Sequence, residues 1–273
     1  MSHTSKKSPA ASPAPGEELV NFAEHLADIA RQIALRYFRN LQGIEYKHDE
    51  TPVTIADREI EQALRQQVAK TYPSHGFTGE EFSARESASP WSWVVDPIDG
   101  TKSFATGKPT FGCLIAMLQE DRPVTGVIEM PALKERWLGT MGRVSTFCGQ
   151  ECATSQTRDL TDATLYATTI DMFSEGEREL FDALSRQTRF RMFGADCYAY
   201  GLLASGHVDL VVEAGMATHD FLALVPVIQG AGGTITDWHG RALDCHSQGQ
   251  ILAAASPELH QRALAILSPV GCT

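Results

Sequence analysis

Length, composition and charge limit what this chain can be. It has 273 residues, 43% apolar and 21% charged, which suits a globular protein with one large core or two modest ones. The formal net charge is −11, and no run of Lys and Arg compensates it. This balance argues against binding to nucleic acid and favours a protein that gathers cations. No apolar run approaches the roughly 20 residues that a membrane-spanning helix needs.

The N-terminal segment, residues 1–16, is predicted to be a disordered tail. It lacks the apolar segment of a secretory signal, and it contains none of the arginines that are typical of a transit peptide. We therefore expect a cytoplasmic protein without a membrane partner.

The cysteines, at positions 113, 148, 152, 197, 245 and 272, are spread along the chain. In a large chain of this kind we predict free thiols rather than a disulfide framework. Cys148 and Cys152 stand four residues apart, and His246 follows Cys245, so each pair resembles a fragment of a zinc site. Neither pair has the CxxC spacing, which favours the plain free-thiol interpretation.

The first half of the chain, residues 17–155, reads as two helices followed by an antiparallel meander. Apolar residues recur at helical spacing from residue 17 to about 40, and a second amphipathic helix begins near Ala56 and is closed by Pro73. Short apolar runs separated by turn residues then predict strands. These runs are residues 76–80, 91–96, 111–119, 123–130, 136–142 and 145–150.

The second half, residues 156–273, alternates strands and helices. We expect strands at 164–170, 190–194, 208–214, 233–238 and 250–255, with helices near 176–187, 197–205, 220–233 and 257–267. Such alternation predicts a mixed sheet with helices on its faces, and therefore a layered α/β protein built from two halves.

The motif "WVVDPIDGTKSF", residues 93–104, places two aspartates close together. If the strand ends at Asp96 and a tight turn at Pro97 and Ile98 leads to Asp99, both carboxylates reach the same edge of the sheet. The Ile98 carbonyl then points toward the gap between them. Carboxylate and carbonyl oxygens are the ligands that Mg²⁺ prefers.

Gly100 and Thr101 open a short predicted helix, whose exposed N–H groups would bind a phosphate beside the cations. The plainer alternative is an Asp-initiated turn with a helix cap.

Two further acidic features accompany this motif. Glu80 and Glu81 end a predicted strand, where neighbouring side chains point to opposite faces, so that only one of them would reach a shared site. Asp220 begins an apolar helix. The plain alternatives are a solvated pair of glutamates and a simple N-cap.

The segments "TPVTIADREIE", "GEEF", "WVVDPIDGTKSF" and "THDFLAL...GAGG" resemble, in this order, the inositol monophosphatase superfamily of Mg²⁺-dependent, lithium-sensitive phosphatases. The resemblance implies an αβαβα sandwich, a homodimer and two or three Mg²⁺ ions per site. The chain departs from the family pattern at His219, where members usually have tryptophan. By resemblance the metal ligands are Glu80, Asp96, the Ile98 carbonyl, Asp99 and Asp220, and the attacking water is held by Asp57, Glu80 and Thr101.

The segment "FGADCYAYGLLASGHVDLVVEAGMATHD", residues 193–220, resembles the histidinol-phosphate phosphatase branch. Asp196 and Glu213, with Tyr198 nearby, would match the ammonium and imidazole groups of that substrate. Asp196 is equally well placed as a helix N-cap. Arg191 would contact a substrate anion or else face water on an alternating strand, and Lys102 and Lys47 are further candidates near the phosphate and the metals.

Three alternatives stay open at this point. One is an inositol-1-phosphate or other sugar or polyol monophosphatase of the same superfamily. Another is a haloacid-dehalogenase-type phosphatase, whose DxDGT string has an aspartate nucleophile, although this chain has DxxDGT. The last is a non-catalytic regulatory protein that binds Mg²⁺ or a phosphoester; the presence of Asp57, Glu80 and Thr101 argues against it.

Overall fold

The computed structural model describes residues 15–40, 44–46 and 52–268. Residues 1–14 of the expected tail, Lys47 and Cys272 lie outside the described residues. The helices are α1 (Glu17–Tyr37), α2 (Ile55–Thr71), α3 (Thr101–Ala105), α4 (Glu175–Ser185), α5 (Tyr198–Ala204), α6 (Thr218–Phe221), α7 (Leu224–Gly230) and α8 (Pro257–Leu267), with 3₁₀ turns η1 (Leu160–Asp162) and η2 (Ile170–Met172). The strands are β1 (Ile44–Tyr46), β2 (Pro52–Thr54), β3 (Gly76–Thr78), β4 (Trp91–Asp99), β5 (Gly112–Gln119), β6 (Arg122–Met130), β7 (Glu135–Thr140), β8 (Thr146–Phe147), β9 (Gln150–Glu151), β10 (Thr164–Ala167), β11 (Phe190–Phe193), β12 (Leu210–Glu213), β13 (Thr234–Thr236) and β14 (Ile251–Ala254).

Helices α1 and α2 are amphipathic and cover one face of the first sheet. Their buried residues recur at helical spacing, as Leu26 and Ile33 do in α1 and Ile60 and Leu64 do in α2. Helix α1 packs on β5 and β6, and α2 packs on β4. Pro73 follows the end of α2, where its ring cannot continue the helix.

The first sheet has seven strands in the order β3-β4-β5-β6-β7-β8-β9. Strands β3 and β4 run parallel, and every later pair is antiparallel, which confirms the predicted meander. The last predicted strand, residues 145–150, is instead a hairpin of β8 and β9. Its turn contains Cys148 and Gly149, which have φ of 49° and 80° and so reverse the chain there.

The second sheet has five strands in the order β11-β10-β12-β14-β13. Strand β10 pairs in parallel with β11 and β12, whereas β14 is antiparallel to β12 and β13, as expected for a mixed sheet. The helix predicted over residues 220–233 is wrong as a single element, because it divides into α6 and α7. Pro226 lacks an N–H group, so it cannot donate the helical hydrogen bond to the Leu222 carbonyl.

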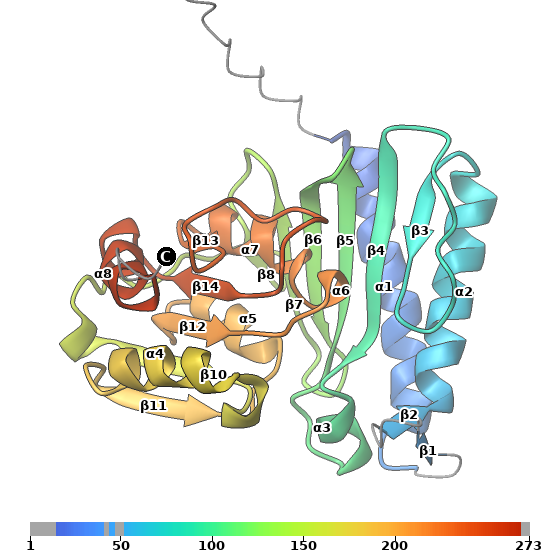
Figure 1. The fold of residues 1–273 in the computed structure, drawn as a ribbon. Coiled ribbons are helices and arrows are strands. Elements are labelled where there is room, and N and C mark those ends of the chain that lie inside the picture. The colour runs from blue at the N-terminus through green and yellow to red at the C-terminus, as the bar shows by residue number, and fades with distance from the viewer. Residues whose placement is uncertain (1–14, 41–43, 47–51, 269–273) are drawn as a thin grey trace, which may run out of the picture.

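The elements stack in five layers (Figure 1). Helices α1 and α2 form the outer layer on the first sheet, and α5 and α7 lie between the two sheets. Helix α7 contacts β6 and β7 on one side and β13 on the other, while α5 contacts β6 and β12. Helix α8 packs on β13 and β14 and against α4. This is the expected αβαβα sandwich; its division into halves at residue 155 stays a prediction.

Strand β4 differs from the sequence expectation in a way that matters for the site. No tight turn follows Asp96; the strand continues through Pro97 and Ile98 to Asp99. Asp96 pairs with Leu114 and Asp99 pairs with Gly112. Between these two pairs β4 therefore advances by three residues, whereas β5 advances by two. This bulge compensates the odd spacing of the two aspartates, which in a regular strand would point to opposite faces.

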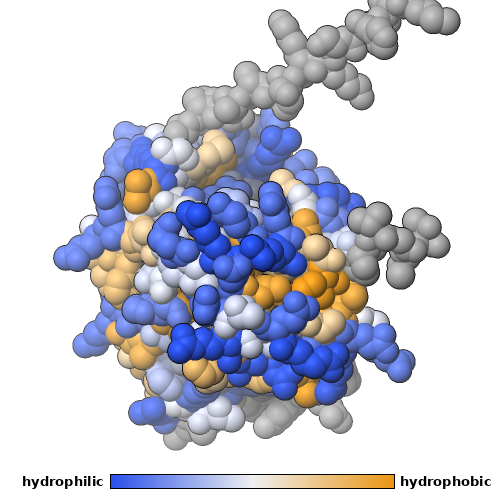
Figure 2. Space-filling view, turned by 90° about the vertical axis from the view of Figure 1, so that its left-hand side faces the viewer, coloured by the Kyte–Doolittle hydropathy of each residue, from blue (hydrophilic) through white to orange (hydrophobic). Residues whose placement is uncertain are grey.

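The surface hydropathy and the state of the cysteines can be compared with the expectations from composition. The face formed by the C-terminal elements is largely hydrophilic, and its apolar residues gather most densely toward the right of the view (Figure 2). None of the helices in the described ranges is long and apolar enough to cross a membrane. The five cysteines within those ranges are free, as predicted: Cys113, Cys148, Cys152, Cys197 and Cys245.

Candidate active site

One pocket of about 310 Å³ gathers most of the predicted site residues. It lies where the end of β4 and the start of α3 face α6, the start of α5 and the end of β12, so elements of both sheets form its wall (Figure 1). Its lining contains no Lys or Arg from the described ranges, although six carboxylates project into it. These are Glu80, Asp96, Asp99, Asp196, Glu213 and Asp220.

Three aspartates form the centre of this pocket. Asp96, Asp99 and Asp220 each place a carboxylate oxygen within 4.8 Å of the other two. Burial raises the pKa of Asp96 well above its usual range, and the neighbouring carboxylates, Asp99 first, raise it further. Burial and then the Asp196 carboxylate raise the pKa of Asp99 in the same direction. The cluster therefore opposes its own ionisation unless cations accompany it.

The hydrogen bonds around the three aspartates leave oxygens for a cation. Asp99 Oδ2 accepts from the backbone N–H of Cys197 at 2.6 Å, and Asp220 Oδ2 accepts from that of Ala217 at 2.7 Å. Asp96 Oδ1 is buried, and no described residue gives it a hydrogen bond. A buried, unsatisfied oxygen among carboxylates is the donor set that suits Mg²⁺, so these residues fit the expected ion.

The residues expected to hold water lie beside this cluster. Thr101 Oγ1 donates to the Ile98 carbonyl at 3.1 Å, and both residues line the pocket. Asp57 is buried in the first turn of α2 and does not line the pocket itself. It lies close enough for its charge to raise the pKa of Asp96.

Gly100 allows Asp196 to approach the end of β4. Its φ is 78°, which strains any residue with a side chain, and a Cβ there would lie 2.9 Å from the Asp196 carboxyl carbon. Ser103 donates to Asp196 Oδ2 at 2.8 Å and so restrains that carboxylate, whose residue lines the pocket. Burial raises the pKa of Asp196, while Ser103 and the charge of Lys108 oppose the rise.

Glu80 and Glu81 separate as predicted, although they lie in the loop after β3 rather than on the strand itself. Glu80 lines the pocket, and Glu81 forms an ion pair with Arg58 at 3.6 Å. Glu61, fully buried on α2, holds this loop, because its Oε2 accepts from the Glu81 N–H at 2.6 Å. Sequence reasoning missed Glu61, yet it stands one helical turn after Asp57.

Glu213 ends β12 and lines the pocket with its carboxylate already hydrogen-bonded. Its Oε1 accepts from the Thr168 N–H and its Oε2 from the Tyr200 hydroxyl, each at 2.9 Å. Burial raises the pKa of Glu213 to about 7, and these two bonds limit the rise. Tyr200 was missed in the sequence, because Tyr198 stands nearer to Asp196.

Some predicted residues are not brought to the pocket. Arg191 lies on the edge strand β11, where its guanidinium contacts Asp182 and the Ser185 hydroxyl of α4 at 3.2 Å, so it faces the helix and not the site. Tyr198 lines a separate pocket of about 470 Å³ with Trp137. Lys102 is exposed and does not line the site.

His219, by contrast, does line the site, and its Nε2 lies 3.3 Å from Asp220 Oδ1. This position beside an expected metal ligand is where the family pattern usually has tryptophan. Thr168, Met172, Met216 and Cys197 also line the pocket without having been predicted, because they come from loops and element ends that carry no pattern of their own.

Comparison with known proteins identifies the family of this chain. The inositol monophosphatase family matches residues 16–271. The chain is 42% identical over 280 residues to the bifunctional phosphatase IMPL2, chloroplastic, of Arabidopsis thaliana, covering 97% of this chain and 81% of that protein. It is 35% identical to a histidinol-phosphatase of Mycobacterium tuberculosis, covering 89% and 95%. A solved inositol monophosphatase from Zymomonas mobilis superposes with a TM-score of 0.85 at 39% identity, covering 92% and 98%. This chain belongs to the inositol monophosphatase family.

Proposed function

We propose that this chain is a Mg²⁺-dependent phosphatase whose preferred substrate is L-histidinol phosphate, converted with water to L-histidinol and phosphate as a step of histidine biosynthesis. Family membership makes it a metal-dependent phosphatase. One observation carries the choice of ester: Asp196 and Glu213 line the same pocket as the aspartate cluster. Their carboxylates suit the ammonium and imidazole groups of this substrate better than a neutral polyol.

The proposed ligands of two or three Mg²⁺ ions are Glu80, Asp96, Asp99, Asp220 and the Ile98 carbonyl. Bound Mg²⁺ would supply the positive charge that stabilises phosphoryl oxygens and lowers the pKa of water. The orphaned Asp96 Oδ1 and the mutual repulsion within the aspartate cluster support this assignment.

The chain's own residues would orient the reactants. Thr101 donates to the Ile98 carbonyl, which leaves its oxygen lone pairs free to accept a hydrogen bond from water. Asp57 and Glu80, which approach Asp96 from α2 and the loop after β3, would complete the water site and accept its proton. Gly100 and Thr101 would bind the phosphate through backbone N–H groups at the start of α3.

A comparison of initial rates tests the substrate. With Mg²⁺ present, we expect higher kcat/KM for L-histidinol phosphate than for myo-inositol 1-phosphate. Asp196→Asn keeps an oxygen for the Ser103 hydroxyl but removes the charge, and should lower kcat/KM for histidinol phosphate by about tenfold, the effect of one lost ionic contact. The same variant should change the rate with inositol phosphate much less. Faster turnover of the inositol ester by the unmodified enzyme would refute the substrate and leave the reaction class intact.

The second candidate is an inositol-1-phosphate or other polyol monophosphatase, which the likeness to the Zymomonas mobilis structure favours. The same rate comparison separates the two. Binding of Mg²⁺ without phosphate release from any ester would instead support the non-catalytic regulatory alternative. An acid-quenched aspartyl phosphate on Asp96 would support a covalent mechanism.

A homodimer is also proposed, and the edge strand β11 supports it. Phe190, Met192 and Phe193 of this strand are 56%, 48% and 39% exposed. An edge strand with large exposed apolar side chains is suited to be covered by another protein surface.

A cytoplasmic location stays a prediction, and the Arabidopsis relative is named as chloroplastic.

A further inference from the structure

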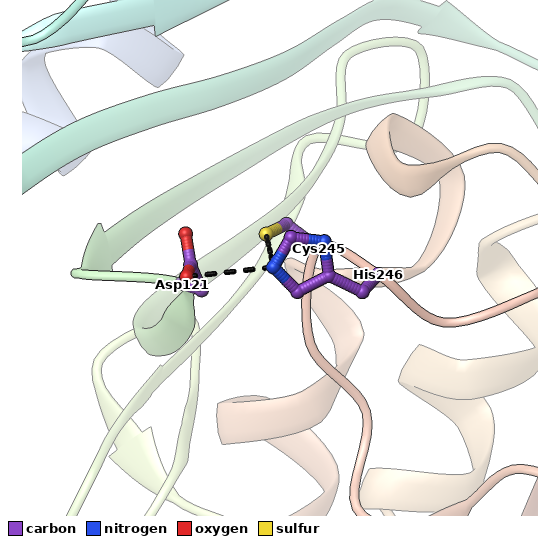
Figure 3. A group of neighbouring side chains, drawn as sticks. All are labelled: Asp121, Cys245 and His246. Carbon is purple, nitrogen blue, oxygen red and sulfur yellow. Dashed lines mark hydrogen bonds and ion pairs between the residues drawn. The ribbon is translucent and has the colours of Figure 1, made fainter.

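A second group of metal-ligating side chains differs in chemistry from the aspartate cluster, because it contains a thiol and an imidazole. Asp121, Cys245 and His246 each place one ligand atom within 4.8 Å of the other two. Figure 3 shows the three side chains pointing toward one another. The adjacent Cys245 and His246 already stood out in the sequence, and the fold adds Asp121 from another segment.

The three residues come from loops of different sheets. Asp121 lies in the two-residue turn between β5 and β6 of the first sheet, and Cys245 and His246 lie in the segment between β13 and β14 of the second. The backbone N–H of Cys245 donates to the Asp121 carbonyl at 3.3 Å, which joins the two loops directly. The loops are therefore already held together where the side chains converge.

The turn that carries Cys245 and His246 is fixed by its neighbours. Asp244 Oδ1 accepts from the backbone N–H of His246 at 2.9 Å, and the Ser247 hydroxyl accepts from that of Asp244 at 3.0 Å. These bonds form a compact turn around Cys245 and His246. A ligand pair on such a turn is arranged before any ion arrives.

The spacing of the ligand atoms agrees with a tetrahedral ion. His246 Nε2 lies 3.6 Å from Cys245 Sγ and 3.5 Å from Asp121 Oδ2 (Figure 3). With metal–ligand bonds of about 2.0 to 2.3 Å, neighbouring ligands of a tetrahedral Zn²⁺ site lie about 3.3 to 3.7 Å apart. Both of these distances fall in that range, and the ligand atoms of Cys245 and Asp121 lie within 4.8 Å of each other.

We propose that Asp121, Cys245 and His246 bind a transition-metal ion of the Zn²⁺ class, with water in the fourth position. A thiol and an imidazole select such an ion over Mg²⁺, which the all-oxygen pocket prefers. On binding, the metal–sulfur bond replaces the S–H bond and the thiol proton goes to solvent. The ion would link a hairpin of the first sheet to a loop of the second.

Cobalt(II) titration of the full chain tests this site. The protein is treated with chelator, supplied with excess Mg²⁺ to occupy the oxygen-rich pocket, and titrated with Co²⁺ while ultraviolet thiolate-to-cobalt absorption is recorded. We expect this band to saturate at one equivalent per chain. It should vanish in Cys245→Ser, and the apparent Kd should rise by more than about tenfold in His246→Gln and Asp121→Asn, since even outer-shell partners of a metal contribute that much.

Cys148→Ser is the matched control, because Cys148 is an exposed thiol on the β8–β9 turn and does not belong to the cluster. It should titrate like the unmodified chain. The side chains of His246 and Asp121 are 75% and 65% exposed, so their variants should unfold at the unmodified temperature when no Co²⁺ is present. Absence of the band at stoichiometric Co²⁺, or its persistence in Cys245→Ser, would overturn the proposal.

Discussion

The clustered carboxylates of the pocket destabilise the folded protein when no cation is bound. Asp96, Asp99 and Asp220 are close enough to repel one another, and burial raises the pKa of each. Ionising such a group without a counter-ion lowers the free energy of unfolding. A bound cation would remove this repulsion, so it should raise the free energy of unfolding most through these three residues.

Asp96→Asn should separate stability from activity. The variant removes a like charge from the buried cluster, so its unfolding temperature in chelator should equal or exceed that of the unmodified chain. The rise in unfolding temperature on adding Mg²⁺ should shrink, and kcat should fall by more than about a hundredfold because a direct ligand is lost. Calorimetry with and without Mg²⁺, together with phosphate release, measures both. Retained activity would contradict the assignment of Asp96 as a ligand.

Glu213 should give the free energy of unfolding a measurable pH dependence. Its pKa is raised from 4.5 in the unfolded chain to about 7 in the fold. The folded state therefore holds this proton more tightly, and the resulting stability is present below the unfolded pKa and is lost as the pH rises through about 7. The shift corresponds to about 3 kcal/mol in all.

Urea unfolding in chelator at pH 5 and pH 8 checks this expectation. The stability of the unmodified chain relative to Glu213→Gln should be greater at pH 5, by up to about 3 kcal/mol, since other titrating groups are common to both proteins. A difference that does not vary with pH would mean that Glu213 ionises in the fold as it does in water.

At the scale of elements, the junction of β4 and α3 organises the site. The bulge between Asp96 and Asp99 turns both aspartates to one side, and Gly100 then bends the chain into α3. Helix α3 has only five residues, so it contributes position more than stability. Its Ser103 hydroxyl reaches Asp196 of the second half of the chain.

Gly100→Ala should be more damaging than an ordinary substitution of a left-handed glycine. Both Gly100 and Gly142 have positive φ, 78° and 77°, but a Cβ at Gly142 would meet nothing within 4 Å. Gly142→Ala should therefore cost only about 1 kcal/mol of backbone strain. Gly100→Ala adds a clash with the Asp196 carboxyl, so it should unfold at lower urea concentration and lose kcat/KM. Equal effects in the two variants would show that the contact with Asp196 does not matter.

At the scale of the whole molecule, close packing of the middle layer sets the distance across the pocket. A Cβ on Gly126 of β6 would lie 1.9 Å from the Ala223 carbonyl, and one on Gly139 of β7 would lie 2.3 Å from the Val227 backbone nitrogen. These glycines let α7 approach the first sheet directly. Because Asp220 precedes α7 by one turn, the same contact brings it to Asp96.

The oligomeric state is the testable property at this scale. The mass of one chain is 29.8 kDa. We expect sedimentation to give about twice that mass, because two chains would form a dimer whose interface contains β11. Phe190→Glu should sediment as a monomer with unchanged far-ultraviolet circular dichroism. Val144→Glu is the control, because Val144 is 54% exposed but lies outside β11, and it should stay dimeric. A monomeric unmodified chain would contradict the proposal.

Much of the secondary structure was predictable, because local rules govern it. Helix α8 spans the predicted residues 257–267, since Ser256 caps it and Pro257 starts it. The bulge in β4 was not predictable, because it depends on how β5 pairs with it. The failure at residues 220–233 is different, since Pro226 carried the local signal for a break.

By itself the sequence determined most of the elements, the family and the acidic residues of the pocket, because periodicity, turn residues and motif spacing are local properties of the chain. Only the tertiary structure decided which charges meet. It placed the Tyr200 hydroxyl against Glu213 and turned Arg191 away to Asp182, and it brought Asp121 to Cys245 and His246 across more than a hundred residues. The physical reason is that such contacts depend on sheet order and layer packing, which join segments that no local pattern connects.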